Sequence, residues 1–148
     1  MKHITFFLIL AAQMFSVKAA PVVLVTQQEM AASNNAPVTF TAKFLPEKDA
    51  PKIEVAAPNL AAPLASPTPI QLNFAATSPA TVKPDTFKVL YGAFQIDITQ
   101  RLLSAAKLTA QGMNVPEASL PSGKHKLHLS VEDSLGRKGY RLVEFQIN

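Results

Sequence analysis

The chain has 148 residues, of which 48% are hydrophobic and 16% charged, and it contains no cysteine. This length suffices for one domain with a core of its own, and the lack of cysteine excludes disulfides and cysteine-built metal sites. The formal net charge is +4, but acidic residues interrupt the densest basic groups, so we expect no nucleic-acid binding.

Residues 1–19 have the pattern of a cleavable secretory signal peptide. Lys2 makes a short basic start, an apolar run follows from Ile4 to Ala12, and Val17 and Ala19 stand at positions −3 and −1 of a cleavage site. The run is shorter than the ~20 residues that span a bilayer, although an uncleaved anchor stays open as an alternative. We therefore expect an exported protein, periplasmic or extracellular, with no transmembrane segment in the mature chain. That mature chain would hold 12 basic and 10 acidic residues.

Residues 20–51 are predicted to form an N-terminal arm or linker that is only partly ordered. Thr26 and Glu29 match a capping box, in which each side chain accepts a hydrogen bond from the other residue's backbone N–H. This motif predicts one or two turns of helix. Val38–Phe44 alternates well enough for an isolated strand, which could add to the chain's own sheet or to a partner's.

Residues 52–148 are predicted to form one all-β domain. The clearest signal is a hairpin from Leu120 to Ile147, in which apolar and polar residues alternate on both sides of a turn at Asp133–Gly139. Residues 99–106 form either one or two helical turns or an irregular crossover, and Lys83–Asp85 predicts a turn. The pattern favours a single antiparallel β-sandwich of about seven strands. The other alternating segments are Ile53–Val55, Ile70–Phe74, Thr86–Tyr91, Phe94–Ile98 and Lys107–Ala110.

Three sequence motifs between Ser66 and Ile147 resemble those of a known class of protein module. They are S-P-x-x-I-x-L-x-F, K-P-D-T-F-K-V and L-P-S-G-K-H-K-L-H-L-S-V-E-D-S-L-G-R. This segment resembles the bacterial immunoglobulin-like and fibronectin-III-like modules of exported proteins, which have a Pro-rich first strand and a strand entered through a Pro-Asp turn. The resemblance implies an Ig-like β-sandwich and carries no activity. The chain lacks the cysteine pair and core tryptophan of antibody domains, so its phenylalanines are expected to fill the centre: Phe74, Phe87, Phe94 and Phe145.

Two pairs of opposite charges, each four residues apart, form a candidate polar patch. Asp97 and Arg101 follow a predicted strand, and Asp133 and Arg137 lie in the predicted hairpin turn. We favour a structural interpretation, in which an ion pair worth about 0.2–1 kcal/mol when exposed stabilises each turn. The functional alternative is a surface that binds a partner's carboxylate or a sugar hydroxyl. Nothing in the sequence brings the two pairs together.

The histidines and the motif content argue against a metal site and against catalysis. His125 and His128 lie three apart in a predicted strand and hence on opposite faces, so they cannot chelate one ion. We expect both histidines to be solvated, and no metal or other cofactor. The chain has no G-x-S-x-G motif, no cysteine nucleophile and no Gly-rich phosphate loop. We therefore predict that the protein is not an enzyme.

Two hypotheses of function come from these patterns. The first is an exported, non-catalytic binding or structural module that acts on an envelope or secreted protein through a surface or a sheet edge. The second is a periplasmic carrier of a small ligand or metal ion, which requires Tyr91, His125 or Arg101 to converge on a pocket. A hydrolase would require a Ser–His–Asp contact at His125 or His128.

Overall fold

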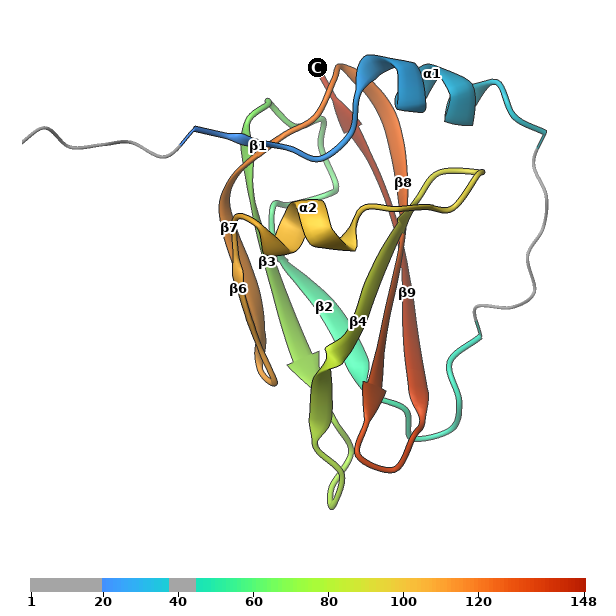
Figure 1. Ribbon diagram of the computed structural model, residues 1–148, viewed down its shortest axis with the longest axis vertical. Coiled ribbons are helices and arrows are strands. Elements are labelled where there is room, and N and C mark those ends of the chain that lie inside the picture. Colours follow the sequence, from blue (N-terminus) through green and yellow to red (C-terminus); the bar gives the residue numbers. More distant parts are fainter. Residues whose placement is uncertain (1–19, 38–44) are drawn as a thin grey trace, which may run out of the picture.

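Two β-sheets packed face to face make up the body of the protein in a computed structural model, which describes residues 20–37 and 45–148 (Figure 1). In the first sheet β3 lies between β2 and β7, and the far side of β7 pairs with both β1 and β6. All these pairings are antiparallel except that of β1 with β7, which is parallel. The strands of this sheet are β1 (Val22–Val23), β2 (Lys52–Ala57), β3 (Thr68–Ala75), β6 (Lys107–Thr109) and β7 (Gly112–Ser119).

The second sheet has the order β5-β4-β8-β9 and is antiparallel throughout. Its long hairpin pairs without interruption from Gly123 with Ile147 to Glu132 with Lys138, so the predicted hairpin is confirmed. The all-β sandwich is confirmed too, with nine strands in the described residues, because β1 and the eight-residue β7 add to the seven predicted segments. The strands of this sheet are β4 (Val82–Tyr91), β5 (Ile96–Asp97), β8 (Gly123–Asp133) and β9 (Lys138–Ile147).

The core lies between the sheets and follows the period-2 alternation of the strands. In β8, Leu127, Leu129 and Val131 are at most 6% exposed, and residues between them face outward. Phe74 of β3 and Phe87 of β4 meet across the core with ring centroids 5.3 Å apart, as expected. Burying side chains of this size contributes about 1.5–3 kcal/mol each, so this interface supplies much of the driving force for folding.

Two sequence predictions in this domain are wrong. Lys83–Asp85 is part of β4 rather than a turn, and Pro84 lies where the ladder to β8 is interrupted, between the Lys83–Glu132 and Lys88–Ser130 pairs. Phe94 is 61% exposed and outside the core. Gly92 and Gln95 have positive φ angles, 65° and 52°, and the N–H of Gln95 donates to the carbonyl of Gly92. This tight turn shortens the predicted strand to Ile96–Asp97 and projects Phe94 outward.

The N-terminal segment is packed into the sandwich. Val22 and Val23 pair with the end of β7, and the next two residues, Leu24 and Val25, are only 0% and 1% exposed. Residues 20–37 are therefore part of the fold, whereas the sequence predicted a partly ordered arm. The division of the chain at Lys52 stays a prediction.

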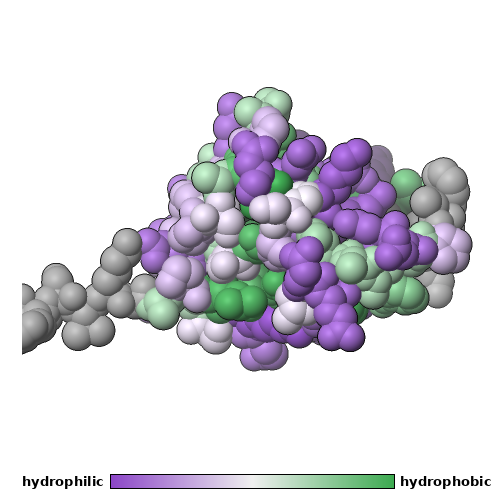
Figure 2. All heavy atoms as spheres, turned by 90° about the horizontal axis from the view of Figure 1, so that it is seen from above, coloured by the Kyte–Doolittle hydropathy of each residue, from purple (hydrophilic) through white to green (hydrophobic). Residues whose placement is uncertain are grey.

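Helix α1 (Gln27–Asn34) crosses one end of the sandwich, beside the C-terminus (Figure 1). The predicted capping box is confirmed, since Thr26 Oγ1 accepts from the Glu29 N–H and Glu29 accepts from the Thr26 N–H. The other end of the helix lies against Gly92, where an added Cβ would overlap the Ser33 side chain. Seen from this end, apolar side chains show in small groups among hydrophilic ones (Figure 2).

The predicted signal peptide (residues 1–19) and the predicted strand Val38–Phe44 lie outside the described residues. Within the part of the chain that the structure describes, neither α1 nor the five-residue α2 (Thr99–Leu103) nor any other helix could cross a membrane.

Substitution of Leu24 tests whether the N-terminal segment belongs to the core. We expect Leu24→Ala to lower the free energy of unfolding by about 2–4 kcal/mol, because it leaves a cavity under β1. Val23→Ala, at the neighbouring 57% exposed position, should change it by less than about 0.5 kcal/mol. Urea unfolding of the two variants measures the difference. Equal values for both would mean that the segment does not contribute to the core.

Candidate functional site

The four residues of the predicted polar patch do not form one site. Arg101 lies in α2, against the upper half of the sandwich, whereas Asp133 and Arg137 flank the β8–β9 turn at the opposite end (Figure 1). Asp97 does not pair with Arg101. Its Oδ1 accepts a hydrogen bond from the Thr99 N–H at 2.9 Å, at the start of α2, and this hydrogen bonding with Thr99 lowers its pKa.

Arg101 instead binds Glu29, 72 residues away in the sequence. Its Nη1 and Nη2 donate to the two carboxylate oxygens at 2.8 and 2.7 Å, and Nη1 also donates to the carbonyl oxygen of Leu24. The hydrogen bonds from Arg101 and from the Thr26 N–H lower the pKa of Glu29 to about 2. One carboxylate therefore caps α1 and joins it to α2, and we call this arrangement the Glu29–Arg101 clasp.

Asp133 and Arg137 do form the predicted ion pair, and their hydrogen bonds stabilise a turn. Asp133 is completely buried, its Oδ1 accepts from the N–H groups of Leu135 and Arg137, and its Oδ2 accepts from Arg137 Nε at 2.7 Å. Desolvation raises the pKa of Asp133, but the hydrogen bonds from Arg137 and Leu135 outweigh it and the net pKa is lowered. Since Arg137 also reaches the carbonyl of Thr77, the pair holds two loops together at this end.

The pocket that a small-ligand carrier would need is not formed by the expected residues. Tyr91 and His125 do converge, but both are buried and bind each other, with Tyr91 Oη 3.0 Å from Nδ1 of His125. Nε2 of His125 is 2.8 Å from the carbonyl oxygen of Pro121, which fixes the proton on Nε2 and leaves Nδ1 to accept from Tyr91. Arg101 is committed to Glu29. The ring nitrogens of His125 thus have no serine or aspartate partner.

His125 also differs from the expectation of a solvated strand histidine. It is only 3% exposed, and its ring stacks on Phe145 at a centroid distance of 5.3 Å. Burial lowers its pKa, so the neutral ring is the form that fits this environment. His125 lies on the inward face of β8 because it shares the period-2 alternation of Leu127 and Leu129. That alternation is visible in the sequence.

Neither a metal nor an organic ligand has an evident place in the interior. Among the described residues no three His, Cys, Asp or Glu side chains come together as a metal site would require. An apolar cavity between the sheets, lined by Leu64, Leu72, Leu129 and Phe145 among others, has a volume of only about 30 Å³. Ligand pockets are roughly ten or more times larger.

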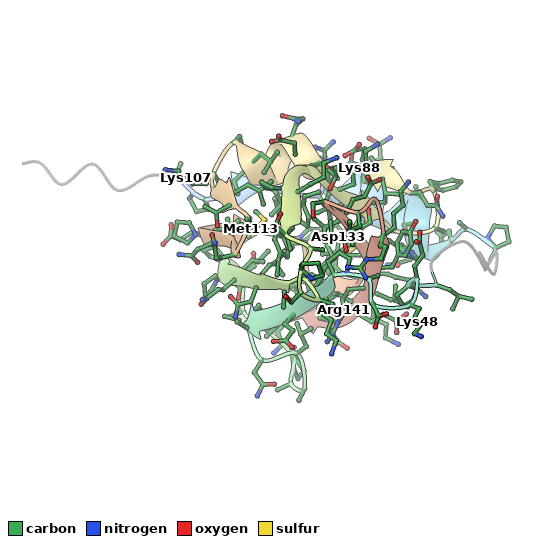
Figure 3. The ribbon with its side chains drawn as sticks, turned by 90° about the horizontal axis from the view of Figure 1, so that it is seen from below. Lys48, Lys88, Lys107, Met113, Asp133 and Arg141 are labelled. Carbon is green, nitrogen blue, oxygen red and sulfur yellow. The ribbon has the colours of Figure 1, made fainter. Side chains whose placement is uncertain are left out.

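A larger groove runs along the side of the sandwich where β2 and β9 lie. It has a volume of about 420 Å³ and lies between residues 46–54, Thr77 and the start of β9. Seen from the lower end, Arg141 lies between Asp133 and the segment with Lys48 (Figure 3). The groove carries both signs of charge, on Glu47, Asp49, Lys52, Glu54 and Arg141.

Every second residue of β9 directs its backbone N–H and C=O groups away from β8, toward the side of the groove. The carbonyl of Lys138 accepts from the Glu47 N–H, and the carbonyl of Gln146 accepts from the Leu64 N–H, so both point away from β8. Because backbone groups alternate along a strand, those of Leu142 and Glu144 point the same way. Within the described ranges these two residues have no backbone partner on that side. The sequence predicted the strand but could not show which of its edges is open.

Comparison of the chain with protein-family models, with curated protein sequences and with solved structures gives no match.

The lowered pKa of Glu29 makes the stability of the clasp depend on pH. The ionised form is favoured in the folded state, so its contribution is complete above the ordinary pKa of 4.5 and is lost as pH falls from there to about 2. We expect Glu29→Gln, which keeps an oxygen to cap α1, to cost about 1–2 kcal/mol at pH 7. The full shift would imply about 3 kcal/mol, but the Arg101 side chain is 38% exposed, which screens the pair.

Chemical unfolding of both proteins between pH 7 and pH 2 measures this effect. The difference in free energy of unfolding between wild type and Glu29→Gln should shrink to near zero at the acid end. The contributions of the other carboxylates cancel in this difference, because both proteins contain them. A difference that stays constant with pH would show that the Glu29 charge does not stabilise the fold.

Proposed function

We propose that this chain is an exported, non-catalytic binding or structural module with an Ig-like fold, acting in the periplasm or outside the cell. In this proposal the module binds an extended segment of an envelope or secreted protein along the outer edge of β9. The bound segment adds a strand to the sheet, a recognised mode of peptide recognition. The predicted signal peptide supports export.

The strand order supports the Ig-like part of the proposal. Ig-like sandwiches place their first, second and fifth strands in one sheet and their third, sixth and seventh in the other. Here β2, β3 and β7 share the first sheet, and β4, β8 and β9 share the second. The short β6 and β5 stand where the fourth strand and the extra strand beside the third would be.

The open edge of β9 is the observation that carries the binding proposal. Long edge strands in soluble proteins are usually blunted, because their free N–H and C=O groups pair with other chains. The other long edge in this sheet, along β4, contains Pro84, and β6 in the first sheet is only three residues long. By contrast β9 has ten residues and no proline. Among the described residues, the backbone contacts to its outer edge come from Glu47 and Leu64, at its two ends.

The neighbouring groove supports the same mode of binding. A strand added to β9 would turn alternate side chains toward the space between β9 and β2, since strand side chains alternate between two faces. There they would meet Arg141 of β9 and Lys52 and Glu54 of β2. Backbone pairing would thus supply affinity, and these charges would supply specificity.

A pair of variants at Leu142 tests the proposal. Leu142→Pro removes the outward N–H of this residue without touching the ladder to β8, whereas Leu142→Ala removes the same side chain and keeps the N–H. We expect a partner captured from an envelope extract by wild-type protein to bind Leu142→Ala nearly as well. Its affinity for Leu142→Pro should be lower by about tenfold or more, because hydrogen bonds of the added strand are lost.

Thermal unfolding of both variants shows whether each still folds. Equal capture by Leu142→Pro and Leu142→Ala would contradict binding at the edge of β9. Failure of the wild-type protein to retain any partner would contradict the proposal as a whole.

A further inference from the structure

The outer face of the β8–β9 hairpin carries five charged side chains, and all except Lys124 form two cross-strand ion pairs. Lys126 of β8 lies opposite Glu144 of β9, with 2.7 Å between nitrogen and oxygen, and Glu132 lies opposite Lys138 at 3.2 Å. Their side chains are between 28% and 61% exposed. Exposed pairs of this kind contribute little to stability, so their arrangement calls for another explanation.

The signs of the four charges alternate both along and across the strands. On β8 the cation Lys126 is followed six residues later by the anion Glu132. On β9 the order of signs is reversed, with Lys138 beside Glu132 and Glu144 beside Lys126. The four side chains thus occupy the corners of a rectangle in which every neighbour has the opposite sign. We call this arrangement the charge rectangle.

The middle of the charge rectangle is less polar than its corners. His128 of β8 pairs in register with Leu142 of β9 and, on its other side, with Leu90 of β4. Leu142 is 50% exposed, and Ser130 and Tyr140 form the next pair along the hairpin. The core of a protein–protein interface is likewise depleted of charged residues relative to its rim.

A charge rectangle of this kind is complementary to itself. When a second copy is turned over by a two-fold axis lying in the plane of the face, along the strands or across them, each corner meets a corner of opposite sign. Rotation about an axis along the strands also places Leu142 of each copy over His128 of the other. Two-fold interfaces in homodimers require this self-complementarity, because the same patch is used by both subunits.

We propose that the outer face of β8 and β9 is a homodimer interface, in which two copies of this chain pack their second sheets face to face. The inference is independent of the binding proposed at the edge of β9, since it uses the face of the strand rather than its outward backbone. The six-residue spacing of the corners makes the patch about 20 Å long. Two strands about 5 Å apart give this patch an area well below the ~800 Å² per partner of stable complexes, so we expect a weak dimer.

The dimer is tested by sedimentation velocity of the purified protein across a concentration series. Leu142→Gln makes the centre polar, and Leu135→Gln is the matched control, since Leu135 is a 62% exposed leucine in the β8–β9 turn. We expect concentration-dependent dimers for wild type and Leu135→Gln, and a dissociation constant at least tenfold higher for Leu142→Gln. A wild-type monomer at all concentrations up to about 1 mM, or equal dimerisation of the two variants, would overturn the proposal.

A charge exchange tests the charge rectangle itself. The double variant Lys126→Glu and Glu144→Lys keeps an ion pair within the chain, so folding should be preserved. Opposite a wild-type copy, however, two of its corners meet charges of the same sign. We expect a fluorescently labelled double variant to form mixed dimers with wild-type protein at least tenfold more weakly than labelled wild type does. Equal mixing would overturn the assignment of the interface to these charges.

Discussion

The bidentate contact between Glu29 and Arg101 is the interaction on which the placement of the N-terminal segment depends. The Glu29 carboxylate receives both terminal nitrogens of Arg101 and the N–H of Thr26. Arg101 in turn binds the carbonyl of Leu24, so α1, α2 and the residues after β1 are joined at one point. This clasp keeps Leu24 and Val25 in the core without a disulfide, in a chain that has no cysteine.

The elements that close one end of the sandwich also determine which strand edges stay exposed. Parallel pairing of β1 covers part of β7, and β6 covers another part, so the first sheet has little exposed edge on that side. At the opposite end Asp133 and Arg137 fix the β8–β9 turn. The open backbone lies instead on β9, next to a groove with both signs of charge. This location is the basis for the proposed binding of another chain.

Local patterns in the sequence predicted much of the fold. Alternation located the β8–β9 hairpin and β3, and the Thr26–Glu29 spacing located α1, because these signals depend on neighbouring residues. Phe94 was wrongly assigned to the core. It lies in a tight turn with two positive φ angles, and apart from Gly92 nothing in the sequence indicates this turn. Pro84 was assigned to a turn because the sequence does not show where the pairing of a strand is interrupted, and such an irregularity accommodates a proline.

The candidate sites depended on contacts that local patterns do not contain. Asp133 and Arg137 are close in sequence and their pairing was predicted, but the partner of Arg101 lies 72 residues away. The charges of β8 and β9 were visible in the sequence as separate residues. Only the register of the hairpin shows that they alternate in sign on one face. Similarly, the direction of the backbone groups of β9 follows from the contacts at its ends.

Amide hydrogen exchange along β9, followed residue by residue by NMR, tests the open edge most directly. The amides of Arg141, Val143 and Phe145 face β8 and should exchange slowly, whereas those of Leu142 and Glu144 should exchange at least a hundredfold faster. This alternation would show that β9 offers an unpaired edge to a partner. Uniform protection of all five amides in the isolated protein would show that the edge is already covered, and would contradict the proposed binding at this edge.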